Sequence, residues 1–257
     1  MFHRLKGKTI FISGASAGIG EAAARQFAAA GASVFLGSRR TDRLETLCKE
    51  LLDSYHISAS YSYLDVQSET GCQEFIDKGL AEFGHCDILI NNAGLARGRD
   101  FAADLKEEDM REMFETNVYG LIRLTKMALK PMLHRGSGHI INLGSVAGYM
   151  SYAGGSVYCA TKFGVRAFSE SLRYELLGKN IRVSCVSPGL VETEFSVVRF
   201  KGDESKAKEV YKNMTPLTAE DIAECLTFVA SRPAHVDIDD LIIRPTEQAG
   251  LTVHRNV

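Results

Sequence analysis

The chain has 257 residues, a formal net charge of −2 and a hydrophobic fraction of 45%. This nearly neutral balance favours neither nucleic acid nor an anionic membrane surface as a partner. No apolar run of about 18 residues predicts a membrane span, and Met1 to Lys8 lack the apolar core of a signal peptide. We therefore expect a cytoplasmic protein.

Short β-rich segments alternate with helix-forming segments along the whole chain. We predict strands at about 8–13, 33–37, 59–64, 87–91, 138–143, 181–187 and 240–243. The segments between them are predicted helices, two of them long, at about 107–133 and 156–177. This alternation is typical of βαβ units around a parallel sheet. It predicts an α/β fold in a single domain spanning 1–257.

A glycine-rich turn separates the first predicted strand from a strongly helix-forming segment at 21–30. Its glycines are Gly14, Gly18 and Gly20. Free backbone N–H groups and the helix dipole at such a helix start favour a pyrophosphate, and glycines allow the backbone to approach it. The turn therefore predicts a dinucleotide site.

The end of the second predicted strand indicates which dinucleotide is bound. Folds that take NAD place an acidic residue there for the ribose 2′-hydroxyl, whereas this chain has Ser38 followed by Arg39 and Arg40. Guanidinium groups suit a 2′-phosphate, so we predict NADP. The alternative is that both arginines are solvated and Asp42 serves the hydroxyl, although we expect Asp42 to cap a helix beginning near Arg43.

Tyr158 and Lys162 form the most informative pair in the chain. A spacing of four residues on a helix places both side chains on one face, and an ammonium beside a phenol lowers the pKa of the phenol. Such a tyrosine can exchange a proton with an alcohol or carbonyl oxygen. Ser145, at the end of the fifth predicted strand, could hold the same oxygen. Alone, the pair could equally be two residues on an amphipathic helix.

Together with the glycine turn, further motifs give the chain a resemblance to the short-chain dehydrogenase/reductase family. They are Asn91-Asn92-Ala93-Gly94, Asn117, the Tyr158/Lys162/Ser145 set and Pro188-Gly189-Leu190-Val191-Glu192-Thr193. The resemblance covers nearly the whole chain and implies a Rossmann-type doubly wound parallel sheet. It also implies a cofactor half at about 1–135 and a catalytic and substrate half at about 136–257.

The resemblance implies site residues at the matching positions. The catalytic residues would be Asn117, Ser145, Tyr158 and Lys162. The cofactor residues would be Gly14, Ser16, Gly18, Ile19, Gly20, Arg39, Arg40, Asp65, Val66, Asn91, Gly94, Tyr158, Lys162, Pro188, Gly189, Val191 and Thr193. Asn117 would connect Lys162 to a chain of waters. The family also implies a homo-oligomer, a dimer or tetramer, built on the two long helices.

Three stretches narrow the resemblance to NADP-dependent 3-hydroxy-acid dehydrogenases, which act on serine, L-allo-threonine and 3-hydroxypropionate-like acids. They are 151–158, the lid segment 194–203, and 232–236 through 244–248 with the tail 249–255. The substrate would contact Ser145 and Tyr158. Its carboxylate needs a cation, for which Arg199 is our first choice, Lys201 the second and Arg97 the third.

Two other functions remain open at this point. One is an NADPH-dependent reductase of larger ketones, aldehydes or dicarbonyls, and the other is a non-catalytic NADP-binding regulator. No metal site is predicted. The six cysteines form no C-x-x-C pair, and we expect reduced thiols in the core.

Overall fold

The structure is a computed structural model that describes residues 2–251. The end of the predicted substrate region, 252–255, lies outside the described residues. Within 2–251, no helix combines the length and the apolar character needed to cross a membrane. The six cysteines are free thiols, of which all but the half-buried Cys225 are buried.

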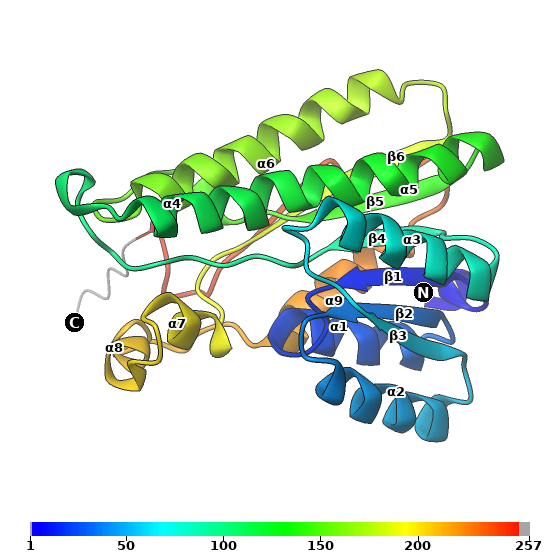
Figure 1. Ribbon diagram of the computed structural model, residues 1–257, viewed down its shortest axis with the longest axis horizontal. Coiled ribbons are helices and arrows are strands. Elements are labelled where there is room, and N and C mark those ends of the chain that lie inside the picture. Colours follow the sequence, from blue (N-terminus) through cyan, green and yellow to red (C-terminus); the bar gives the residue numbers. More distant parts are fainter. Residues whose placement is uncertain (1, 252–257) are drawn as a thin grey trace.

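Seven parallel strands form one sheet in the order β3-β2-β1-β4-β5-β6-β7 (Figure 1). The strands are β1 (Thr9–Ser13), β2 (Ser33–Ser38), β3 (Ala59–Tyr63), β4 (Ile88–Asn91), β5 (Gly138–Leu143), β6 (Ile181–Pro188) and β7 (Asp240–Ile243). Each predicted strand is present, with ends shifted by no more than one residue. The α/β Rossmann-type prediction is confirmed. The strand order reverses between β1 and β4, where such folds bind their ligands at the carboxyl ends of the strands.

Helices cover both faces of the sheet, which explains why the central strands are almost wholly buried. One face carries α1 (Gly18–Ala29), α2 (Thr41–Tyr55) and α9 (Ala219–Ala230). The other carries α3 (Glu69–Phe83), α5 (Leu121–Arg135) and α6 (Ser156–Glu175). Figure 1 shows these as two layers, with α7 (Glu194–Arg199) and α8 (Glu204–Glu209) lying outside them. Short 3₁₀ turns occupy Phe2–Leu5, Ala102–Asp104 and Val146–Gly148.

The first predicted long helix is continuous but not uniform. It runs as α4 (Glu107–Phe114), a π-helical segment Glu115–Gly120 and then α5. The second corresponds to α6.

The prediction that Asp42 caps a helix was wrong. Helix α2 begins at Thr41, and its N-cap residue is Arg40. The Ser38 hydroxyl accepts a hydrogen bond from the Arg40 N–H at 3.0 Å, which turns the chain early and leaves Asp42 in the first helical turn.

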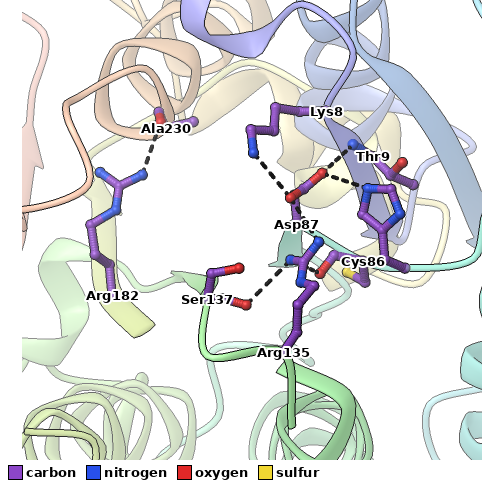
Figure 2. Close-up of polar contacts among 9 residues, drawn as sticks. Lys8, Thr9, Cys86, Asp87, Arg135, Ser137, Arg182 and Ala230 are labelled. Carbon is purple, nitrogen blue, oxygen red and sulfur yellow. Dashed lines mark hydrogen bonds and ion pairs between the residues drawn. The ribbon is translucent and has the colours of Figure 1, made fainter. Parts of the chain in front are cut away.

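A polar network joins the amino ends of the central strands, at the edge of the sheet opposite the ligand edge (Figure 2). Asp87 accepts hydrogen bonds from the Thr9 N–H at 2.9 Å, Lys8 at 3.2 Å and Arg135 at 3.0 Å. Burial alone would raise the pKa of Asp87, but these donors hold it below its ordinary value. Arg135 also donates to the carbonyl of Ser137, just before β5. The network therefore fixes the ends of β1, β4 and β5 relative to one another.

Candidate active site

A cavity opens at the carboxyl ends of β5 and β6, between α6 and α7. Ser145, Tyr158, Lys162 and Arg199 all line it. Segments far apart in the sequence therefore meet at the carboxyl ends of the strands.

Tyr158 and Ser145 both line this cavity and lie within hydrogen-bonding reach of each other. Ser145 follows β5, and its hydroxyl accepts a hydrogen bond from the Ala147 N–H at 3.1 Å. Burial raises the pKa of Tyr158 strongly, while the hydrogen bond with Ser145 and the charge of Arg199 act to lower it. Proton exchange near neutral pH therefore depends on groups that favour the phenolate.

Lys162 lies one helical turn beyond Tyr158 and is 7% exposed. Its ammonium donates to the Leu143 carbonyl at 2.8 Å and lies 6.0 Å from the centroid of the Tyr158 ring. Burial lowers the pKa of Lys162 to about 8. We expected this ammonium to lower the pKa of Tyr158, but it is not among the groups that act on that phenol here.

Asn117 lies behind the cavity, in the π-helical segment. Its amide donates to the Leu95 carbonyl at 2.8 Å and its carbonyl oxygen accepts from the Leu95 N–H at 2.8 Å. The amide also donates to the Thr161 hydroxyl at 3.1 Å. Thr161 adjoins Lys162 on α6, so Asn117 connects the loop after β4 to α6.

The glycine turn leaves the helix start open to a ligand. Gly14 and Gly18 have positive φ angles of 69° and 55°, which L side chains rarely adopt. At Gly20 a Cβ atom would collide with the Gly14 carbonyl and the Asn92 side chain. These three positions therefore require glycine, and Gly18 and Ile19 line the main cavity.

A second cavity adjoins the first on the side of β2 and β3. Its lining includes Gly14, Ser16, Arg39, Arg40, Asp65 and Val66. Within residues 2–251, Arg39 has no hydrogen bond or ion pair, so its guanidinium is free to meet an anion. The predicted cofactor residues therefore line two adjoining cavities.

Between the two cavities, Glu194 of α7 bridges to two arginines. It pairs with Arg40 at 2.8 Å and with Arg43 at 2.7 Å. Arg40 also donates from Nε to the Ser16 hydroxyl at 3.1 Å. The start of α7 is thereby attached to the segment that ends β2.

The remaining predicted cofactor residues divide into two groups. Gly94, Pro188, Gly189, Val191 and Thr193 line the main cavity. Asn91 does not: its amide is buried and donates to Thr125 and to Asn142, each at 2.8 Å. Asn92 lines the cavity instead, with its amide donating to the carbonyls of Ser13 and Gly14.

Arg199 reaches the cavity from α7 and is 7% exposed. Its Nε donates to the Gly98 carbonyl at 2.9 Å, and one Nη donates to the Tyr152 hydroxyl at 2.6 Å. Its guanidinium carbon lies 5.7 Å from the centroid of the Tyr158 ring. Among residues 2–251 it has no carboxylate partner.

The structure does not bring Lys201 or Arg97 to the cavity. Lys201 pairs with Asp109 of α4 at 2.9 Å. Arg97 forms a bidentate ion pair with Glu112, with hydrogen bonds of 2.6 and 2.7 Å, and also donates to the Val198 carbonyl at 2.7 Å. Both cations fasten the lid segment to neighbouring elements.

Among the lining residues that the sequence did not predict as site residues are Arg99, Tyr152 and Gln248. Gln248 is 4% exposed, and its side-chain oxygen accepts from the Leu190 N–H at 2.9 Å. Its Nε2 has no partner among the described residues. Tyr152 and Gln248 fall within stretches that resembled the hydroxy-acid group, a signal that could have singled them out.

The fold and the site together define the class of protein to which the chain belongs. The family model for short chain dehydrogenases matches residues 8–204, and the chain belongs to this family. The chain is 46% identical to the NADP-dependent 3-hydroxy acid dehydrogenase of Schizosaccharomyces pombe, with 96% of each chain covered. It is 45% identical to the NADP-dependent 3-hydroxy acid dehydrogenase YdfG of Escherichia coli strain K12, over 96% of this chain and 99% of that one.

Among solved structures, the closed form of serine dehydrogenase complexed with NADP+ is similar with a TM-score of 0.89 and 44% identity. That match covers 96% of this chain and all of the other.

We predict that the buried ammonium of Lys162 makes stability depend on pH. Its pKa is about 8 in the folded protein against 10.5 in the unfolded chain, so between these values the unfolded chain binds more protons. The free energy of unfolding therefore rises with pH through this window. Lys162→Met removes the effect. As pH rises through the window, the free energy of unfolding of Lys162→Met should fall relative to that of the parent by up to ~3 kcal/mol. Urea unfolding without cofactor measures both values. A difference that is independent of pH would contradict the buried charge.

We predict that replacing both Arg39 and Arg40 by Ala lowers kcat/KM for NADP+ by about 10²–10⁴-fold, since each of the two charge-assisted bonds to a phosphate is worth ~1.5–3 kcal/mol. The value for NAD+ should change little, because its ribose carries no phosphate. Steady-state kinetics with both cofactors measure this. A parent enzyme that prefers NAD+ would refute the role of these arginines.

Proposed function

We infer that the chain is an NADP-dependent 3-hydroxy acid dehydrogenase, acting on small acids of the serine, L-allo-threonine and 3-hydroxypropionate type or on their semialdehydes. The observation that carries this proposal is a buried guanidinium, Arg199, beside the Ser145–Tyr158 pair and without a carboxylate partner. A buried cation needs a counter-charge. A carboxylate two bonds from the reacting carbon supplies one. The full-length similarity to 3-hydroxy acid dehydrogenases supports the same substrate class.

The residues present fit NADP, because two adjoining cavities carry the glycine turn in one and the free Arg39 in the other. Arg39 and Arg40 would hold the 2′-phosphate, and Gln248, with its free Nε2, would donate to the nicotinamide end. When bound, the nicotinamide supplies the hydride chemistry of the reaction.

In this proposal the protein handles the proton and the substrate. The Tyr158 phenolic oxygen takes the proton of the 3-hydroxyl during oxidation and returns it during reduction. Ser145 hydrogen-bonds the same oxygen in both states. The hydrogen bond from Ser145 and the charge of Arg199 favour the phenolate, and Asn117 holds the helix and loop that position Lys162.

We further propose a cytoplasmic, single-domain protein that assembles as a dimer or tetramer. Large apolar side chains on the outer faces of the helices α4, α5 and α6 are exposed, including Phe114, Leu133, Phe163 and Tyr174. Burying such side chains against a second copy of the chain would shield them from water.

We predict that Tyr158→Phe nearly abolishes turnover of hydroxy acids while the protein still binds NADPH. The change removes only the phenolic oxygen, and loss of acid–base work costs about 10²–10⁴-fold in rate. Turnover is followed as NADPH absorbance, and NADPH binding by fluorescence. Activity within about tenfold of the parent would exclude Tyr158 as the acid–base group.

We predict that Arg199→Ala lowers kcat/KM for 3-hydroxypropionate by about 10–100-fold, which corresponds to a direct charge-assisted bond of ~1.5–3 kcal/mol. Turnover of the neutral 3-hydroxypropionamide should change far less. Lys201→Ala is the matched control, since it removes a lid attachment outside the cavity. Equal losses on acid and amide in Arg199→Ala would mean that Arg199 only orders the lid.

A further inference from the structure

Arg99 lies at the mouth of the main cavity and faces the same aromatic ring as Arg199. Its guanidinium carbon lies 5.8 Å from the centroid of the Tyr152 ring, against 5.5 Å for Arg199. Arg199 is buried, whereas Arg99 is exposed. Two cations therefore line one wall of the cavity, Arg199 inside beside Tyr158 and Arg99 further out.

No acid in the described part of the chain forms an ion pair with either arginine. The one acidic side chain among the described residues lining the cavity is Glu194, and it pairs with Arg40 and Arg43. Asp100, next in sequence, forms no ion pair with Arg99 in the described part of the chain. Partial desolvation, and then the positive charge of Arg199, lower the pKa of Arg99. Such a wall attracts anions.

The two guanidinium groups differ in the donors they have left. Arg199 uses its Nε for the Gly98 carbonyl and one Nη for the Tyr152 hydroxyl. Arg99 has no hydrogen bond within residues 2–251, and the attraction of its charge to the Tyr152 ring leaves its N–H groups free. All of its guanidinium N–H donors therefore remain available for a bidentate pair of hydrogen bonds to a carboxylate.

We propose that Arg99 is a specificity-determining residue that binds a second carboxylate of the substrate, so that the enzyme prefers dicarboxylic 3-hydroxy acids to their monocarboxylic counterparts. The inference rests on the proposed function, in which Arg199 meets the first carboxylate. The reacting carbon lies between the two acid groups, with its oxygen held by Ser145 and Tyr158. The outer acid group reaches the mouth, where Arg99 is exposed.

A matched pair of substrates tests this preference. 3-Hydroxyglutarate differs from 3-hydroxybutyrate by one carboxylate in place of a hydrogen on the terminal methyl group. Its oxidation with NADP+ gives 3-oxoglutarate, NADPH and a proton. We expect kcat/KM for 3-hydroxyglutarate to exceed that for either enantiomer of 3-hydroxybutyrate by about tenfold or more. Arg99→Gln should lower the ratio of these kcat/KM values to about one, mainly through a higher KM for the dicarboxylate.

Arg97→Gln is the matched control. It removes an arginine two residues away that pairs with Glu112 outside the cavity. The ratio of kcat/KM for the dicarboxylate to that for the monocarboxylate should stay as in the parent enzyme. Calorimetric titration of the NADPH complex with glutarate and with butyrate measures binding independently of turnover, and should show the same dependence on Arg99.

The outcomes separate the two proposals. A parent enzyme that oxidises the monocarboxylate at least as well, and binds butyrate as tightly as glutarate, would overturn the role of Arg99 and leave the proposed function intact. A preference that survives in Arg99→Gln would also overturn it. Failure to oxidise any hydroxy acid, with turnover of uncharged carbonyls, would overturn both.

Discussion

A buried ammonium is the constraint on which the rest of the site depends. Lys162 lies almost wholly out of water, where an unpaired cation is costly, and its ammonium donates a hydrogen bond to the carbonyl of Leu143, the last residue of β5. The strand end and helix α6 must therefore stay in close contact. The turn after β5 makes this possible, because a Cβ on Gly148 would lie 2.7 Å from the Lys162 carbonyl oxygen. The helix can approach only a residue without a side chain there.

The same contact places the other reacting groups. With Lys162 fixed against β5, Tyr158 comes one turn earlier on α6 and opposite Ser145. Asn117 holds the helix from behind, through Thr161. Arg199 then completes the cavity from α7, which is itself fastened at Glu194, Val198 and Arg199 to segments that follow β2 and β4. The positive wall of the cavity is thus carried by elements outside the sheet.

The sequence predicted those parts of the molecule whose position follows from the chain itself. Strand positions follow from apolar runs between helix-forming segments, and Ser145, Tyr158 and Lys162 reach one cavity because strand ends and helix starts meet at one edge. The choice of partner for a charged side chain is a different matter. Lys201 and Arg97 are cations of the same lid region as Arg199, but acids on α4 lie within their reach. Asn91 belongs to a recognised motif, yet its amide turns into the core toward Asn142. Such outcomes depend on which groups the folded chain brings within a few ångströms.

Because of the π-helical segment Glu115–Gly120, the attachment of the lid segment depends on the number of residues in a helix. A π turn holds one residue more than an α turn, and each residue in a helix turns the chain by about 100°. Losing one residue here would rotate α4 relative to α5, although the sheet and the glycine turn would be untouched. Asp109 and Glu112 would then point away from Lys201 and Arg97. Relatives of this chain should accordingly keep the number of residues between α4 and α5 unchanged, and a deletion there should cost them the lid before it costs them the dinucleotide.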